Sequence, residues 1–145
     1  MFDYLIKNGQ LIDGTGSPAR RADVGITDGK IAAIGDLSAA QAGTVIDAAG
    51  KTVTPGFIDI HRHADAALFR PHFGDLELKQ GLTTIVNGNC GLSVTPCSGP
   101  YRGEIEAYLT PVTGELPADA ACSSMQAYLD AARRQPSPVH TAMLA

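Results

Sequence analysis

The stretch that most constrains this chain is residues 54–63, which read TPGFIDIHRH. An apolar run ends here in two histidines separated by one residue, after a proline and a glycine that suit the start of a strand. Because side chains alternate between the faces of a β-strand, we expect Asp59, His61 and His63 to share one face. Neutral imidazole is the commonest protein ligand for zinc. The pair therefore predicts half of a metal chelate, against the alternative of two buried, hydrogen-bonded histidines.

A second strand is predicted over residues 82–87 by the β-branched run LTTIVN. Between the two strands, residues 73–80 suit a short helix that Gly81 ends, with acidic residues near its start and a lysine near its end. Strand, helix and strand in this order make a βαβ unit, whose strands are parallel and whose crossover is right-handed. The chain is therefore predicted to be an α/β protein.

Cys90 follows the second strand directly, in the run Gly88-Asn89-Cys90-Gly91. Active sites of parallel barrels lie at the C-terminal ends of the strands, so we expect Cys90 near His61 and His63. A thiolate there can complete metal coordination, and the flanking glycines allow the backbone to approach an ion. An inert, buried cysteine fits the spacing equally well. From the residues alone, the two interpretations are even.

Both motifs resemble those of a known family. Residues 55–63 resemble the first barrel strand of the metal-dependent amidohydrolase superfamily, and residues 88–91 are similar to the second-strand motif of its N-acyl-D-amino-acid deacylase (D-aminoacylase) branch. In that branch, a cysteine at this position takes a metal-binding place for which other amidohydrolases often use a carboxylated lysine. The resemblance therefore implies that His61, His63 and Cys90 bind zinc, as one or two divalent ions.

The resemblance also implies an activity, which is the hydrolysis of N-acyl-D-amino acids by a metal-bound hydroxide that attacks the amide carbonyl. The family's remaining metal histidines and its catalytic aspartate come from later barrel strands, so the catalytic residue is expected beyond Ala145. Asp59 is expected to orient the histidines, and Asp65 to support the ligands from behind. Arg62 departs from the small or neutral residue usual between these histidines, and we expect its side chain to face away from the site.

Residues 1–54 are predicted to form a small antiparallel β-sheet or sandwich unit. Three segments are expected to fold back as hairpins, over residues 4–13, 22–35 and 45–54. Asn8-Gly9 and Asp28-Gly29, at the tips of the first two, are typical of type I′ turns. Turn chemistry accounts for these dipeptides, and we assign them no catalytic role.

Residues 55–145 are predicted to begin a (β/α)8 barrel that this chain is too short to close. Prolines and glycines interrupt residues 92–122, where we expect at most one or two helical turns over 104–109 and a specificity loop or lid. A capping box and helical apolar spacing predict the clearest helix over residues 123–134. Residues 139–145 are predicted to be a third strand.

The remaining histidines and cysteines fall outside the predicted metal site. Cys97 and Cys122 have no ligand spacing, and we expect them to be structural or merely exposed. His72 is expected to be a solvated loop residue. His140 lies early in the third strand, far from its C-terminal end, so we expect a packing role for it.

Length and composition limit what this chain can do. The 145 residues suffice for one ordinary domain, whereas a closed (β/α)8 barrel takes about 250 residues. We therefore expect a fragment, or one piece of a larger enzyme whose barrel is completed by the same or another chain, and an inactive protein when these residues stand alone. The formal net charge of −4 argues against nucleic acid or an anionic membrane as a partner. The partner expected instead is a small-molecule substrate.

The sequence contains no apolar run of the roughly 18 residues that a membrane-spanning helix needs. Its three cysteines are spaced too irregularly for a disulfide framework. We therefore expect a soluble, cytoplasmic protein. Two alternatives remain. The first is a cyclic-amide hydrolase of the dihydroorotase or hydantoinase kind, which residues 88–91 argue against. The second is a truncated chain without catalytic activity.

Overall fold

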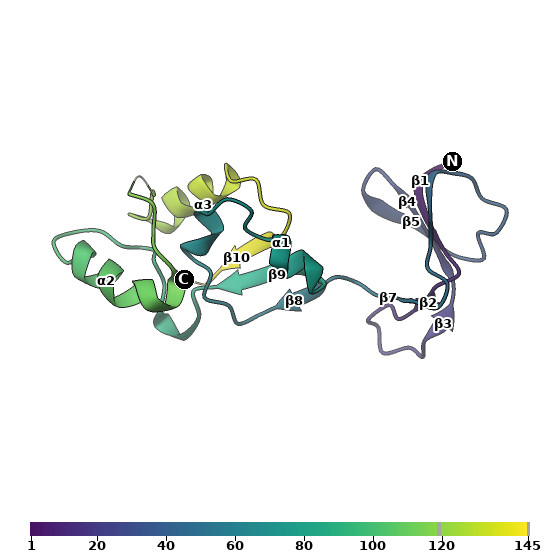
Figure 1. Ribbon diagram of the computed structural model, residues 1–145, viewed down its shortest axis with the longest axis horizontal. Coiled ribbons are helices and arrows are strands. Elements are labelled where there is room, and N and C mark those ends of the chain that lie inside the picture. Colours follow the sequence, from purple (N-terminus) through teal and green to yellow (C-terminus); the bar gives the residue numbers. More distant parts are fainter. Residues whose placement is uncertain (119, 145) are drawn as a thin grey trace. The chain divides into compact units, whose positions relative to one another are not determined.

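The computed structural model describes residues 1–118 and 120–144. The chain divides into two compact units, Met1–Pro55 and Gly56–Ala145. Figure 1 shows the strands of the first unit in purple and blue, and the second unit in teal, green and yellow. Among the described residues, no helix has both the length and the apolar character needed to cross a membrane.

The first unit consists of short strands in two sheets. Its strands are β1 (Phe2–Lys7), β2 (Gln10–Leu11), β3 (Arg20–Arg21), β4 (Asp23–Thr27), β5 (Lys30–Gly35), β6 (Ala42–Asp47) and β7 (Thr52–Val53). One sheet has the strand order β5-β4-β1-β6, and the other has the order β3-β2-β7. Leu5, Leu11, Val24 and Ala48 are the buried apolar side chains of this unit.

The predicted antiparallel character of this unit is wrong in part. β1 pairs with β4 and β4 with β5 in antiparallel fashion, but β1 pairs with β6 and β2 with β7 in parallel. The chain crosses from one sheet to the other at Asn8-Gly9, so the first predicted hairpin does not form. The side chains of Asp23 and Asp47 hold this crossing, because each accepts a hydrogen bond from Asn8, at 3.0 and 2.9 Å. The third predicted hairpin fails likewise, because β6 and β7 belong to different sheets.

The hairpin predicted at Asp28-Gly29 is confirmed. β4 and β5 pair in antiparallel fashion on either side of it, with Thr27 opposite Lys30. Asp28 and Gly29 have φ angles of 52° and 69°. Positive φ at both central residues is the property of a type I′ turn that makes asparagine, aspartate and glycine favourable there.

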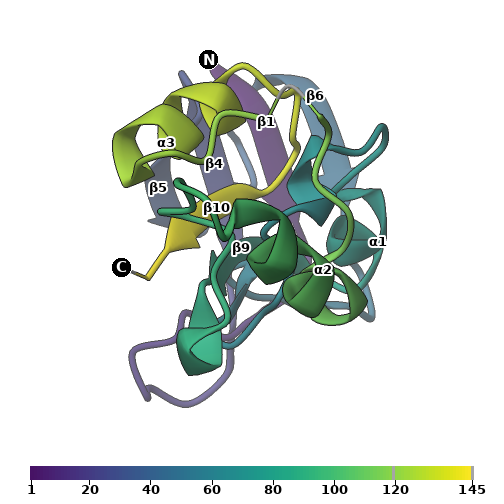
Figure 2. The ribbon, with the colours of Figure 1, turned by 90° about the vertical axis from the view of Figure 1, so that its left-hand side faces the viewer.

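The second unit is built on a three-stranded parallel sheet of order β10-β9-β8. Its strands are β8 (Phe57–Asp59), β9 (Leu82–Asn87) and β10 (His140–Met143), its helices are α1 (Asp75–Lys79), α2 (Arg102–Thr113) and α3 (Met125–Arg133), and its 3₁₀ turns are η1 (Ala67–Phe69) and η2 (Asn89–Gly91). The parallel pairing of β8 with β9 across α1 confirms the predicted βαβ unit. Figure 1 shows α2 beyond the C-terminal ends of β9 and β10, and Figure 2 views the unit from that end.

The core of the second unit lies where the helices meet the segment after β8. It is a cluster of buried side chains from η1, α2, α3 and the adjoining loops, namely Ala66, Leu68, Val94, Leu109 and Tyr128. The rings of Phe69 and Tyr128 meet edge to face, with centroids 5.7 Å apart. α3 confirms the predicted helix, although Ser124 rather than Ser123 caps it by accepting a hydrogen bond from the Ala127 N–H at 3.1 Å.

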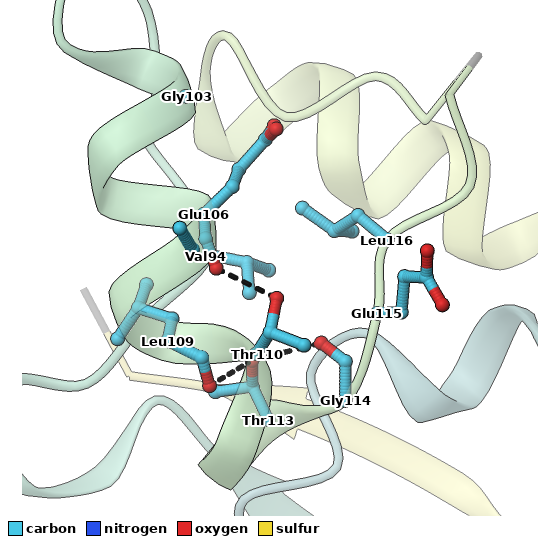
Figure 3. Close-up of a pocket in the computed structure, with 10 residues that line it drawn as sticks. Val94, Gly103, Glu106, Leu109, Thr110, Thr113, Gly114, Glu115 and Leu116 are labelled. Carbon is cyan, nitrogen blue, oxygen red and sulfur yellow. Dashed lines mark hydrogen bonds between the residues drawn. The ribbon is translucent and has the colours of Figure 1, made fainter.

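α2 is longer than predicted. It runs for 12 residues and includes Pro111, where we expected one or two turns. Proline lacks the N–H that would donate a hydrogen bond to the carbonyl four residues earlier in a helix. The hydroxyls of Thr110 and Thr113 donate to the carbonyls of Glu106 and Leu109, at 2.7 and 3.2 Å, and Figure 3 draws both bonds. The helix continues for two residues past the proline and ends at Thr113.

Candidate metal centre

The two histidines lie just beyond the strand on which they were predicted. β8 ends at Asp59, so His61 and His63 lie in the segment that follows it. This segment stays bonded to β9, because the Arg62 N–H donates to the Val86 carbonyl at 2.9 Å. The Asp59 carboxylate accepts a hydrogen bond from the His61 backbone N–H at 3.1 Å. A side chain that binds the backbone two residues later turns the chain out of a regular ladder. Asp59 thus holds the backbone of His61. The sequence analysis predicted instead that Asp59 orients the imidazole rings.

Cys90 lies in a tight turn that only particular residues can form. Its φ of 60° is left-handed, between Gly88 at 77° and Gly91 at 68°. A Cβ atom on Gly88 would lie 2.7 Å from the carbonyl oxygen of Leu144, so a larger residue does not fit there. Left-handed backbone is uncommon for a residue with a side chain. This turn leaves Cys90 exposed at the end of β9.

The structure brings the three predicted ligands together. One candidate ligand atom from each of His61, His63 and Cys90 lies within 4.8 Å of the others. His61 Nε2 and Cys90 Sγ are 3.2 Å apart, and the two imidazole rings meet at 72° with centroids 5.5 Å apart. Zinc holds nitrogen at about 2.0–2.1 Å and sulfur at about 2.3 Å in tetrahedral sets, so its ligand atoms lie about 3.5 Å apart. The three side chains fit such an ion with small adjustments.

Buried polar atoms without partners gather beside these side chains. His63 Nδ1, both carboxylate oxygens of Asp65 and Asn87 Nδ2 are buried and make no hydrogen bond among the described residues. Burial raises the pKa of the Asp65 carboxyl, and nearby backbone N–H groups, those of Gly88 and Val94 among them, partly oppose this rise. Buried polar groups are ordinarily paired, and exceptions concentrate at functional sites. Asp65 lies beside the candidate centre, and its role in supporting the ligands stays a prediction.

Two asparagines that we did not predict as site residues tie the histidine segment to the cysteine turn. Asn87 Oδ1 accepts a hydrogen bond from the Ala64 N–H at 2.9 Å. Asn89 Nδ2 donates to the carbonyls of Val86 at 2.8 Å and Arg62 at 3.3 Å. Both asparagines are buried. Their position on either side of Gly88, at the end of a strand, was the available sequence signal.

Tyr128, from a distant part of the chain, bonds to the backbone of Asp65. Its side chain is fully buried, as expected for a core residue, and its hydroxyl donates to the backbone carbonyl of Asp65 at 2.8 Å. The helical apolar spacing predicted the burial of this ring. It did not predict the bond, because the two residues are 63 positions apart.

The other histidines and cysteines lie outside the cluster. His72 is exposed, and its Nδ1 lies 3.5 Å from the Asp75 carboxylate. His140 is exposed at the start of β10, so the packing role predicted for it is wrong in this structure. Cys97 and Cys122 are buried and structural, and the Cys97 N–H donates to the Cys122 carbonyl at 2.7 Å. Burial raises the pKa of the Cys122 thiol.

Two pockets lie near α2. The pocket in Figure 3, with a volume of about 270 Å³, is lined by residues of α2 and the segment after it, Glu106, Thr110 and Leu116 among them. None of the candidate ligands lines it. A second pocket, of about 340 Å³, is lined among others by Gly91, the residue after Cys90, and by Tyr108 of α2. The candidate ligands do not line this pocket either, but its lining includes the neighbour of Cys90 in the sequence.

Comparison with known proteins gives a consistent result. A sequence profile described as the amidohydrolase family matches residues 44–136. A D-aminoacylase of Alcaligenes xylosoxydans xylosoxydans is 52% identical over 95 residues, which are 66% of this chain and 20% of that protein. The crystal structure of N-acyl-D-glutamate deacylase from Bordetella bronchiseptica, complexed with zinc and a phosphonate mimic of the tetrahedral intermediate, superposes with a TM-score of 0.79 at 42% identity. That match covers 99% of this chain and 29% of the deacylase chain.

A D-aminoacylase structure, described by the functional role of its binuclear metal centre, superposes with a TM-score of 0.81 at 39% identity, over all of this chain and 30% of that one. The chain thus spans about a fifth to three tenths of the length of these relatives.

Proposed function

The chain belongs to the amidohydrolase family, and on that premise we propose that the protein hydrolyses the amide bond of N-acyl-D-amino acids. The observation that carries this proposal is the convergence of His61, His63 and Cys90, whose ligand atoms lie within 4.8 Å of one another. The similar D-aminoacylase and N-acyl-D-glutamate deacylase support the choice of substrate class. The products are a carboxylate and the free D-amino acid.

We propose that these three side chains hold zinc, as part of a site for one or two divalent ions. Two imidazoles and a thiolate form a donor set that favours zinc over magnesium or manganese. The relatives support this choice, since one structure contains zinc and another is described as binuclear. A metal bound here supplies a Lewis acid for the amide carbonyl and an acidified water.

The chain's own residues prepare this site. Asn89 fixes the turn that presents the thiol, and Asn87 fixes the backbone after His63, through the hydrogen bonds described above. The Cys90 thiol must lose its proton to become a ligand, so metal affinity falls as the pH drops. Exposure of His61 and Cys90 leaves their side of the site open to a substrate.

We propose that the parallel sheet β8-β9-β10 begins a (β/α)8 barrel that further residues, from the same or another chain, complete. Strands adjacent in the sequence are adjacent in this sheet, as in such barrels. Phe57, Ile58 and Ile60 are exposed at and just after the edge strand β8, which suits a face that more chain covers. The remaining metal ligands and the catalytic aspartate belong to that further part.

We assign the pocket beside Cys90 to the substrate's acyl group or side chain. Tyr101, Ile105 and Tyr108 present apolar surface there, on the segment for which a specificity loop was predicted. Because all three cysteines carry free thiols, we also propose that the protein works in a reducing compartment, the cytoplasm.

The test uses the natural-length protein, by which we mean these residues together with the part of the same or another chain that completes the barrel, loaded with zinc and offered N-acetyl-D- and N-acetyl-L-amino acids. We expect release of D-amino acids only, its loss on treatment with a chelator, and its return with zinc. The isolated residues 1–145 serve as the control and are expected to be inactive, because a zinc hydrolase needs a general base besides its three ligands. Selectivity for L-amino acids, indifference to the chelator, or zinc-dependent turnover by residues 1–145 would contradict the proposal.

A further inference from the structure

Arg62 stands between the two proposed histidine ligands, and its backbone is bonded on both sides. Its N–H donates to the Val86 carbonyl at 2.9 Å, and its carbonyl accepts from Asn89 Nδ2 at 3.3 Å. Asn89 directly precedes Cys90. The peptide groups that flank the two histidines are therefore bonded to the segment that carries the third ligand.

The side chain of Arg62 pairs with α1. Its Nη2 donates to Glu77 Oε1 at 2.7 Å. The Glu77 side chain is only 8% exposed, whereas that of Arg62 is 40% exposed. A carboxylate taken out of water needs a cationic or hydrogen-bonding partner. The ion pair therefore joins the segment between the ligands to the crossover helix α1.

A second carboxylate lies on the other side of the guanidinium. Arg62 Nη1 is 4.0 Å from Asp59 Oδ2, and Asp59 Oδ1 accepts the hydrogen bond from the His61 N–H at 3.1 Å. The planar guanidinium thus lies between two carboxylates, one on α1 and one that holds the backbone of His61. A lysine ammonium offers a single point of attachment and reproduces only part of this arrangement.

We infer that Arg62 and Glu77 act as a positioning pair for the metal ligands. The pair fixes the segment that bears His61 and His63 against α1, so that both imidazoles meet Cys90 at the distances that a metal ion requires. The inference rests on the proposed function, because it concerns the same metal centre. Neither Arg62 nor Glu77 contacts the substrate in this account, and both act through the histidines.

The variants Arg62→Gln, Glu77→Gln and their combination test this role in the natural-length protein. The affinity for zinc is measured by competition with a chromophoric chelator. We expect each single change to weaken zinc binding about tenfold, the low end for residues that support metal ligands. The double variant should lose no more zinc affinity than the single variant that binds zinc more weakly, because both changes remove the same contact. Arg133→Gln breaks an exposed ion pair of the same 2.7 Å length in α3 and should leave zinc affinity unchanged.

Cobalt substitution separates positioning from general stabilisation. The absorption bands of Co²⁺ bound to thiolate and imidazole report the geometry of the loaded site, which a merely structural residue would not alter. We expect shifted bands in Arg62→Gln and partial recovery of both the bands and the zinc affinity in Arg62→Lys. Where Arg62→Gln does not fold, Arg62→Lys and Glu77→Gln decide by the same two readouts.

Wild-type affinity and unshifted cobalt bands in Arg62→Gln and Glu77→Gln would overturn the inference, even if their thermal stability fell. The proposed function would then still stand. A wild-type protein that binds no zinc would overturn both together, so the two failures are distinguishable.

Discussion

The two units of this chain use polar side chains in opposite ways. In the first unit, all of whose residues are described, no polar or charged side chain is buried, and contacts such as those of Asp13 with Thr15 and Arg20 lie at the surface. In the second unit, several polar side chains are buried, and they are Asp65, Glu77, Asn87, Asn89, Thr95 and Thr113. Exposed polar contacts can be exchanged for contacts with water at small cost, whereas buried ones cannot.

The buried polar atoms that lack partners are also confined to one region. Among the described residues, they belong to His63, Asp65 and Asn87, all close in sequence to the candidate ligands. Buried polar groups without a protein partner are exceptions in folded proteins and concentrate at functional sites. They therefore distinguish the second unit, which holds the proposed metal centre, from the first, whose residues are all described and where no such atom is found.

The largest expected effect comes from removing the thiol of the second unit. Cys90→Ser keeps the size of the side chain but replaces a good zinc ligand with a poor one. Zinc content should fall well below one ion per protein, and activity should fall about 100-fold or more, the upper range for lost metal-site support. Metal analysis and kcat/KM measure both. Cys97→Ser and Cys122→Ser, at the buried thiols, should leave zinc content close to that of the wild type.

A core truncation in the first unit should affect stability alone. Leu5 is fully buried there, and Leu5→Ala should lower the free energy of unfolding by about 3 kcal/mol. Zinc affinity should not change, because the three candidate ligands lie in the second unit. Denaturant unfolding and zinc titration of the same sample check this, and a parallel loss of zinc affinity would remove the distinction between the units.

A smaller effect is expected from Tyr128→Phe. The change keeps the buried ring but removes the hydroxyl that donates to the Asp65 carbonyl at 2.8 Å. Stability should fall by about 1–2 kcal/mol, because a buried carbonyl loses its donor. Tyr4→Phe removes an exposed hydroxyl in the first unit and serves as the control, with no measurable effect expected. Equal stability of the two variants in thermal unfolding would contradict the contrast drawn between buried and exposed polar groups.

The smallest effect concerns acid stability of the first unit. Hydrogen bonds from Arg20 and then Thr15 lower the pKa of Asp13 from 3.8 to about 2. A carboxyl whose pKa is lower in the folded than in the unfolded state stabilises the fold above its unfolded pKa, and this contribution is lost as the pH falls. Between pH 4 and pH 2, the wild type should therefore lose more stability than Asp13→Asn. Thermal unfolding over this pH range checks the prediction, and parallel curves for the two proteins would refute it.

Local sequence predicted one turn correctly and failed at a similar one. Asp28-Gly29 forms its type I′ hairpin, whereas Asn8-Gly9 carries the chain between two sheets. The difference lies in contacts distant in sequence, because Asp23 and Asp47 bind Asn8 from 15 and 39 residues away. A dipeptide indicates that the chain turns, but the strands available elsewhere decide which pairs form.

The ligands of the candidate centre were predictable, and their support was not. The position of His61 and His63 at the end of one strand and of Cys90 at the end of the next predicted that the three side chains lie close together. From the residues alone, a ligand role and an inert role for Cys90 were even, and the family resemblance implied the ligand role. The hydrogen bond from Tyr128 to Asp65 and the ion pair of Arg62 with Glu77 join separate elements, and no local pattern indicates such contacts. The unpaired state of the Asp65 carboxylate likewise emerges only when the chain is folded.

Zinc K-edge X-ray absorption of the natural-length protein tests the central claim most directly, because it identifies the atoms bound to the ion. We predict one sulfur scatterer at about 2.3 Å together with nitrogen or oxygen scatterers at about 2.0–2.1 Å, and the loss of the sulfur shell in Cys90→Ser. A first shell of nitrogen and oxygen alone in the zinc-loaded wild type, with Cys90 still open to alkylation, would contradict the assignment of His61, His63 and Cys90 as the metal centre.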